Sequence, residues 1–160
     1  MVPNPTFSIF LPDDHATTRL GRLLAGLVGC GDTLLLHGPI GAGKTHLARA
    51  LIKTRLGPQE EVPSPSFTLV QTYSGGDTEI WHADLYRLSH PDDVLELGLE
   101  DAFATALCLV EWPDRLGKSA PASALHITLS SEADGRRALL SGAGHQTLLT
   151  RLADAWAKDD

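Results

Sequence analysis

Residues 33–45 read TLLLHGPIGAGKT, a short apolar run that leads directly into a glycine-rich segment. The last eight residues match the phosphate-loop pattern, in which a glycine and four further residues precede Gly-Lys-Thr. Glycines let backbone N–H groups surround phosphate oxygens without Cβ clashes, and a following helix adds the positive end of its dipole. We therefore predict a nucleoside triphosphate site, with Lys44 at the β- and γ-phosphates and the Thr45 hydroxyl on Mg²⁺. The predicted phosphate-binding residues are Gly38, Pro39, Ile40, Gly41, Ala42, Gly43, Lys44 and Thr45.

The segments around this loop indicate an α/β fold. An apolar strand precedes the loop and an amphipathic helix follows it, which disfavours the alternative of a glycine-rich turn without a ligand. Apolar residues at helical spacing predict helices over residues 16–28, 47–56, 94–106 with a break near Gly98, and 148–156. Strand patterns cover residues 6–11, 33–36, 67–73, 78–88, 107–110, 125–129 and 137–140, and loops are expected over 60–65 and 113–122. This order predicts a three-layer P-loop NTPase fold with a mixed, largely parallel sheet.

Length and charge limit the organisation and the partners of the chain. Its 160 residues suffice for one sizeable core, so we expect a single P-loop ATPase domain over residues 1–160. The 20 acidic residues outnumber the 13 basic ones, and the formal net charge of −7 repels a polyanion at long range. No dense run of Lys and Arg with interleaved aromatic residues offsets this repulsion. Autonomous binding of nucleic acid is therefore disfavoured, and a partner is expected to hold any RNA.

Cysteine use and the amino-terminal sequence indicate the cytoplasm. Cys30 and Cys108 are far apart and lack metal-ligand spacing, as suits free thiols in a reducing compartment. Asp13 and Asp14 lie where an export signal would be basic, and no apolar stretch approaches membrane-spanning length. We expect a cytoplasmic protein that does not associate with a membrane.

Two acidic residues are candidates for chemistry beside the phosphates. Glu111 ends the apolar run 107–110, and the carboxyl ends of strands in an α/β sheet gather beside the phosphate loop. It is expected to hold Mg²⁺ through water or to orient an attacking water, unless its carboxylate simply extends into solvent. Asp84 shares one face of its predicted strand with His82. On pattern alone, an exposed polar face explains these two residues as well as a site does.

Two ring side chains beside these segments receive no role. His37 precedes the phosphate loop, but a single histidine without a paired ligand is more often hydrogen-bonded structure than metal chemistry. Trp112 follows Glu111 and could cover the site or meet a partner, although packing explains it equally well.

Four segments together resemble the TsaE family of bacterial P-loop ATPases. They are the phosphate loop, residues 64–70 (SPSFTLV), residues 82–88 (HADLYRL) and residues 110–113 (VEWP), and their order and spacing also match. The two middle segments are far more specific than a phosphate loop, which many families share. The resemblance implies an ATPase that acts with two protein partners in making threonylcarbamoyladenosine in tRNA. Its hydrolysis of ATP would support turnover by the modifying complex, and it would meet tRNA only through those partners.

The same resemblance assigns roles by motif position. It implies that the catalytic residues are Lys44, Asp84 and Glu111, and that the ligands of Mg²⁺ are Thr45, Glu111 and Asp84. It further implies that Ser66 or Thr68 senses the γ-phosphate. The residues that could border the base or the ribose are Asp14, Thr17 and Arg136. The chain departs from the common family pattern at Ile40, His46 and Ser66, where leucine, threonine and threonine are frequent, without loss of a phosphate or metal contact.

Two other functions remain open. A small-metabolite kinase shares this size and this type of loop, but its lid is usually rich in arginine, whereas residues 112–122 offer only Arg115 and Lys118. A nucleotide-gated interaction module would bind ATP without significant hydrolysis. Slow hydrolysis by the isolated ATPase is expected, because the obvious internal candidates for an arginine finger are Arg87 and Arg115 alone.

Overall fold

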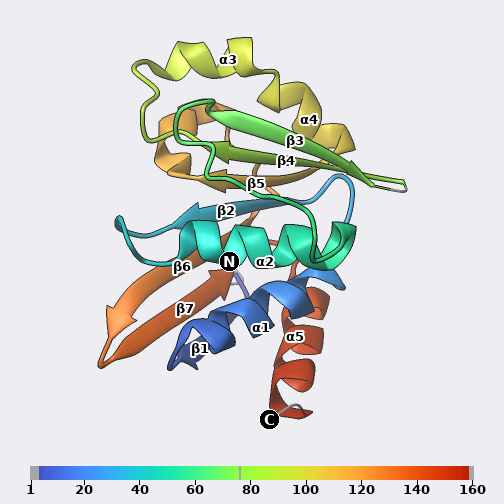
Figure 1. Ribbon diagram of the computed structural model, residues 1–160, viewed down its shortest axis with the longest axis vertical. Coiled ribbons are helices and arrows are strands. Elements are labelled where there is room, and N and C mark those ends of the chain that lie inside the picture. The colour runs from blue at the N-terminus through green and yellow to red at the C-terminus, as the bar shows by residue number, and fades with distance from the viewer. Residues whose placement is uncertain (1–3, 76, 159–160) are drawn as a thin grey trace.

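The computed structural model describes residues 4–75 and 77–158 and contains one seven-stranded sheet with helices on both faces (Figure 1). The strands lie in the order β1-β7-β6-β2-β5-β4-β3. Their bounds are Thr6–Leu11 (β1), Thr33–His37 (β2), Val70–Gly75 (β3), Thr78–Asp84 (β4), Leu107–Glu111 (β5), Leu125–Glu132 (β6) and Gly135–Ser141 (β7). The helices are Asp14–Ala25 (α1), Lys44–Leu56 (α2), Val94–Leu97 (α3), Leu99–Thr105 (α4) and Gln146–Lys158 (α5), with 3₁₀ turns at Pro91–Asp93 (η1) and Pro113–Ser119 (η2).

The direction of the strands explains where a site can form. β6, β2, β5 and β4 are neighbours and pair in parallel, whereas β3, β7 and β1 join by antiparallel pairing. Only β7 and β3 therefore run opposite to the other strands, which confirms the mixed, largely parallel sheet. The carboxyl ends of β2, β5 and β4 lie at one edge, and the phosphate loop leaves β2 there.

Apolar side chains from both faces of the sheet form separate layers of core. One layer packs α1, α2 and α5 against the sheet, and its helical members include Leu20, Leu24, Leu47, Leu51, Leu149 and Leu152. The other layer packs α3, α4 and η2 against the opposite face, with Val94, Leu99 and Leu116 as members. The predicted three-layer arrangement is confirmed. Among the described residues, no helix has both the length and the apolar character needed to cross a membrane.

Most predicted elements are present, but some end elsewhere. The helix predicted to reach residue 28 stops at Ala25, because the Gly26 N–H caps the carbonyls of Leu23 and Leu24. The predicted loop over residues 113–122 instead contains η2, which begins with a proline whose φ suits a helical turn. The hairpin between β3 and β4 is confirmed, although Gly76 of its turn lies outside the described residues.

Two predicted strands are too long, and both errors lie beside the site. Residues 67–69 form a turn before β3, since the Leu69 N–H donates to the Pro65 carbonyl at 2.6 Å and Leu69 has a φ of 68°. Residues 85–88 leave β4, since the Leu88 N–H donates to the Leu85 carbonyl at 3.0 Å. These turns place the two segments with the most specific family motifs at the carboxyl edge of the sheet.

The contact between α1 and α2 generates a stability prediction. A Cβ at Gly21 would lie 2.7 Å from Ala50 Cβ and 2.9 Å from the Leu47 carbonyl oxygen. Gly21→Ala is therefore expected to lower the free energy of unfolding by about 1–2 kcal/mol, because overpacking outweighs the gain of about 1 kcal/mol in helix propensity. Urea denaturation measures the change.

Gly26→Ala is the matched control, since its Cβ would meet nothing closer than the Leu23 oxygen at 3.7 Å and its φ is −85°. If both variants unfold at the same urea concentration as the parent chain, the close approach of the two helices is wrong.

Candidate nucleotide-binding site

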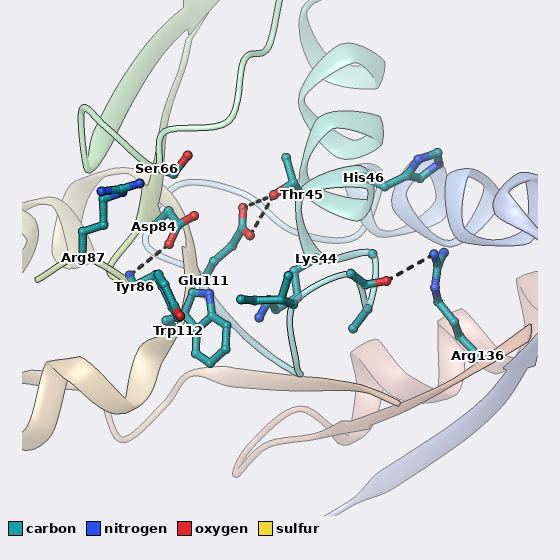
Figure 2. A pocket seen from close by; sticks show the side chains of 14 residues that line it. Lys44, Thr45, His46, Ser66, Asp84, Tyr86, Arg87, Glu111, Trp112 and Arg136 are labelled. Atoms are coloured by element: carbon teal, nitrogen blue, oxygen red, sulfur yellow. Dashed lines mark hydrogen bonds between the residues drawn. The ribbon is translucent and has the colours of Figure 1, made fainter. Parts of the chain in front are cut away.

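A pocket of about 380 Å³ opens at the carboxyl edge of the sheet, over the phosphate loop (Figure 2). Its lining combines residues 40–46 with side chains from distant segments, namely Ser66, Asp84, Tyr86, Arg87, Glu111, Trp112 and Arg136. The structure thus brings the predicted catalytic residues Lys44, Asp84 and Glu111 into one pocket. Thr68 does not line it and accepts a hydrogen bond from Gln71 Nε2 at 3.0 Å.

The phosphate loop depends on glycine at defined positions. Gly43 has a φ of 102° and immediately precedes α2. Gly38 has a φ of 147°, and a Cβ there would lie 2.6 Å from the Leu129 carbonyl oxygen of β6. Because α2 begins at Lys44, N–H groups of its first turn without intrahelical partners lie next to the loop. The end of a strand, a turn rich in glycine and a helix amino terminus form the type of anion site that the sequence predicts.

Lys44 is held inside the protein by contacts with the backbone and with an aromatic ring. Its side chain is buried, its Nζ donates a hydrogen bond to the Gly38 carbonyl, and Nζ lies 3.6 Å from the ring centroid of Trp112. Burial lowers the pKa of Lys44, while nearby carboxylates, Glu111 first, oppose that shift. The amine therefore has partners that a phosphate group can replace.

Trp112 covers the lysine because of its backbone conformation. It precedes Pro113, a position that favours extended backbone, yet its φ and ψ are 58° and 53°. The ring also packs against Tyr86, with 4.8 Å between ring centroids. The sequence left open whether Trp112 covers the site, meets a partner or packs in the fold. The structure shows its ring over the site.

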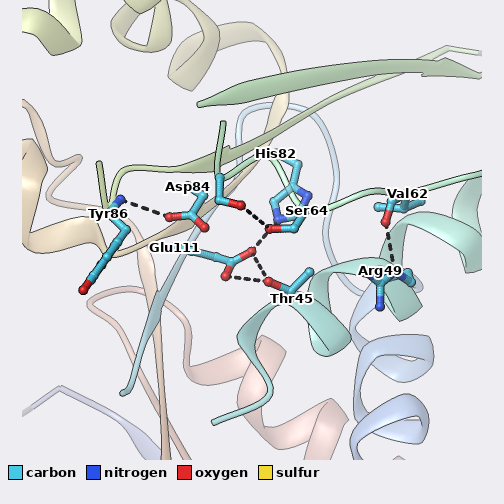
Figure 3. Close-up of polar contacts among 9 residues, drawn as sticks. Thr45, Arg49, Val62, Ser64, His82, Asp84, Tyr86 and Glu111 are labelled. Atoms are coloured by element: carbon cyan, nitrogen blue, oxygen red, sulfur yellow. Dashed lines mark hydrogen bonds and ion pairs between the residues drawn. The ribbon is translucent and has the colours of Figure 1, made fainter. Parts of the chain in front are cut away.

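Glu111 receives hydrogen bonds from two sides (Figure 3). Thr45 Oγ1 lies 2.8 Å from Glu111 Oε1 and 3.0 Å from Oε2, and it donates to this carboxylate. On the other side, His82 Nε2 lies 2.7 Å from Glu111 Oε2. Glu111 is 2% exposed, so its carboxylate does not extend into solvent.

Asp84 is the neighbour of Glu111 across the sheet. The two residues pair in the parallel register of β4 and β5, so their side chains emerge on the same face. Asp84 Oδ1 accepts a hydrogen bond from the Tyr86 N–H at 3.0 Å, and burial raises the pKa of this carboxyl group. The polar face of β4 is buried: His82 is 0% exposed and Asp84 is 6% exposed.

The oxygen atoms at the pocket have the chemistry that Mg²⁺ prefers. Within the described part of the chain, no group of three or more His, Cys, Asp or Glu side chains forms a ready metal cage. Magnesium in phosphate-transfer sites needs only one or two protein oxygens, because phosphate oxygens and water complete its coordination. The Thr45 hydroxyl and the Glu111 carboxylate fit that requirement, with Asp84 beside them.

A second cavity, of about 310 Å³, adjoins the phosphate loop on the side of α1 and β7. Arg136 and Asp14 line it and form an ion pair, with 3.0 Å between Nη1 and Oδ1. Arg136 Nη2 also lies 3.5 Å from the Gly41 carbonyl oxygen. Thr17, the third residue assigned to the base or ribose, is fully buried and lines neither this cavity nor the first.

Sequence reasoning missed the role of His82. Its position two residues before Asp84 put it on the correct face, but nothing in the pattern indicated a buried partner on another strand. The sequence also did not show whether Arg87 or Arg115 would lie at the site. Arg87 lines the pocket, with its guanidinium 4.5 Å from the ring centroid of Phe67, whereas Arg115 does not line it.

Comparisons with known proteins agree with this geometry. The family model described as "Threonylcarbamoyl adenosine biosynthesis protein TsaE" matches residues 11–139. Proteins named tRNA threonylcarbamoyladenosine biosynthesis protein TsaE are similar in sequence. The protein from Rickettsia felis is 41% identical over 106 residues, which are 66% of this chain and 62% of that protein. The protein from Rickettsia conorii is 41% identical over 65% of this chain and 59% of its own length.

Another relative is covered more fully. The Treponema pallidum protein of the same name is 36% identical over 122 residues, which are 76% of this chain and 89% of that protein. The aligned region thus spans less than two thirds of the two Rickettsia proteins, but most of the Treponema protein.

The fold has a counterpart among solved structures. The crystal structure of YdiB from Bacillus subtilis superposes with a TM-score of 0.75 at 22% identity, over 99% of this chain and 98% of that one. That likeness concerns the fold, and the family model together with the sequence relatives establishes the kinship. The chain belongs to the TsaE family, whose model is described as a threonylcarbamoyl adenosine biosynthesis protein.

Proposed function

We propose that this protein is the ATP-hydrolysing component of the machinery that makes threonylcarbamoyladenosine in tRNA, and that it acts in the cytoplasm through two protein partners. The observation that carries this proposal is the convergence of Thr45, Asp84 and Glu111 beside a phosphate loop. This is the donor set that a nucleoside triphosphate and Mg²⁺ require. The family supplies the pathway, and the pocket supports the hydrolysis.

The roles of the individual side chains follow from their surroundings. Lys44 would exchange the Gly38 carbonyl for phosphate oxygens, and the loop N–H groups would bind the same anion. Thr45 and Glu111 would hold Mg²⁺, with Asp84 beside them, and the bound ion would neutralise charge on the phosphates. Asp84, which lines the pocket and whose pKa is raised by burial, would exchange a proton with an attacking water.

The base and ribose have a place beside the loop. The cavity with Arg136 and Asp14 adjoins Gly41, so a nucleotide whose phosphates occupy the loop can extend into it. Arg136 offers a planar cation for stacking or hydrogen bonding, and Asp14 offers a carboxylate to a ribose hydroxyl. Both groups are already oriented by their mutual ion pair.

A small-metabolite kinase is less well supported. In this proposal, one nucleotide would occupy both cavities, with its phosphates in the pocket over the loop and its base and ribose beside Asp14 and Arg136. Neither Arg115 nor Lys118, the basic residues expected of a kinase lid, lines the pocket.

The first prediction concerns the site residues. Lys44→Ala is expected to lower kcat of ATP hydrolysis by about 10²–10³-fold, because it removes a donor that stabilises charge on the transferring phosphate. Glu111→Gln keeps the shape of the side chain and removes its charge, and we expect a loss of similar size. Phosphate release under saturating ATP and Mg²⁺ measures both.

The controls are exposed residues of the same types. Lys118→Ala and Glu96→Gln remove the same charges away from the pocket and should leave hydrolysis unchanged. Undiminished turnover in both site variants would refute the assignment.

The second prediction concerns the partners. An arginine finger supplied by another protein accelerates P-loop hydrolysis by about 10³–10⁵-fold, and Arg87 here is stacked on Phe67. ATP hydrolysis is expected to be slow for the chain alone and to rise on assembly with the two partner proteins. Single-turnover phosphate release, measured with and without the partners, tests this.

Equal rates in the two conditions would contradict the prediction. Tight nucleotide binding without phosphate release in the assembled complex would instead identify a nucleotide-gated interaction module.

A further inference from the structure

His82 is a buried polar residue whose position the proposed function does not explain. It is 0% exposed and lies near the end of β4, two residues before the last residue of the strand. Its neighbours in register are Gln71 on β3 and Leu109 on β5. A histidine placed there for packing alone would leave a polar ring without hydrogen bonds in the core, which is costly. The hydrogen bond to Glu111 must therefore be part of the reason for this residue type.

Among the described residues, the imidazole of His82 has one hydrogen-bond partner, Glu111. Glu111, as a carboxylate, only accepts, so the hydrogen of the 2.7 Å contact belongs to His82 Nε2. The other ring nitrogen, Nδ1, is buried and has no partner among the described residues. A hydrogen placed on Nδ1 would be an unsatisfied buried donor, whereas a bare Nδ1 leaves only an unused acceptor. Within the described structure, the imidazole has a single hydrogen-bonding function, which is to hold Glu111 Oε2.

The two donors on Glu111 differ in what nucleotide binding would do to them. The Thr45 hydroxyl donates to Glu111, and it would give up this hydrogen bond if the threonine served as a metal ligand. His82 lies on the far side of the carboxylate, in a strand of the core, and has no such competing role (Figure 3). With Thr45 engaged by a metal, His82 would be the remaining side-chain donor, among the hydrogen bonds described, to hold the orientation of the carboxylate.

We propose that His82 is a positioning residue, which orients the Glu111 carboxylate so that Oε1 faces Mg²⁺ while Oε2 stays bound to the imidazole. This proposal rests on the proposed function, because it assumes that Glu111 serves the metal of a bound nucleotide. Outer partners of this kind orient metal ligands elsewhere, and their loss typically reduces metal affinity or activity by about 10–100-fold. His82 does not line the pocket and is hydrogen-bonded to Glu111, so its effect would pass through Glu111.

Two substitutions of similar length separate this role from packing. His82→Gln can place an amide N–H near the position of Nε2, and His82→Met fills a similar volume without a donor. Circular dichroism and thermal unfolding establish that each variant folds. Binding of a fluorescent, non-hydrolysable ATP analogue is then measured in Mg²⁺ and in EDTA, and Mn²⁺ binding to the nucleotide complex is titrated by electron paramagnetic resonance.

The expected result is a selective loss of metal affinity. His82→Met should weaken Mn²⁺ binding, and the Mg²⁺-dependent part of nucleotide binding, by about 10–100-fold. It should leave nucleotide affinity in EDTA unchanged, because the phosphate loop is intact. His82→Gln should restore most of the metal affinity, since it supplies the missing donor. In hydrolysis, His82→Met should require more Mg²⁺ for half-maximal rate.

Other outcomes overturn the proposal in distinguishable ways. Equal metal affinity in the parent chain and in His82→Met would show that His82 does not position Glu111, while the proposed function stands. Equal losses in Met and Gln variants, extending to nucleotide binding in EDTA, would show a packing role only. Failure of the parent chain itself to bind nucleotide would overturn the proposed function and this inference together.

Discussion

The site depends on a carboxylate that the fold has removed from water. Burial of a charged group costs several kcal/mol unless hydrogen bonds replace its hydration. Glu111 is 2% exposed, and its two oxygens take donors from Thr45 at the start of α2 and from His82 in β4. The hydrogen bonds that the Glu111 carboxylate requires therefore join β5 to α2 and to β4. The requirement is met only if β5 lies between β2 and β4, which is the strand order observed.

The other charged groups of the pocket also have partners that replace part of their hydration. Lys44 is close to the Gly38 carbonyl and the face of Trp112, which together replace part of its hydration. Asp84 receives the Tyr86 N–H. The present contacts of Lys44 and Asp84 are weaker than the phosphate or metal contacts that would replace them. Binding of nucleotide and Mg²⁺ would thus exchange satisfied contacts for stronger ones, without first exposing a bare charge.

The fold brings together residues that lie far apart in the sequence. Arg136 in β7 meets Asp14 at the start of α1 across 122 positions of sequence, beside the loop. The pairing of β1, β7 and β6 on one side of β2 makes this meeting possible, while β5 and β4 on the other side carry Glu111 and Asp84. The phosphate loop leaves the central strand between these two halves. The cavity lined by Asp14 and Arg136 therefore lies on one side of the loop, and the acidic residues of β4 and β5 lie on the other.

Local sequence determined the phosphate loop, most of the strands and helices and the class of ligand, because glycine placement and apolar periodicity act over a few residues. It also placed Glu111 correctly, since a polar residue that ends a buried strand reaches the edge of a parallel sheet. It misjudged residues 67–69 and 85–88, where the chain turns: the Leu69 N–H donates to the Pro65 carbonyl and the Leu88 N–H donates to the Leu85 carbonyl. The resemblance assigned Thr17 to the base or the ribose, but Thr17 is buried, because packing decides which face of α1 turns toward the core.

The tertiary structure alone decided three contacts: the hydrogen bond of His82 with Glu111, the position of Trp112 over Lys44 and the ion pair of Arg136 with Asp14. Such contacts depend on strand order and register, which arise from the packing of the whole sheet and leave no short-range pattern in the sequence.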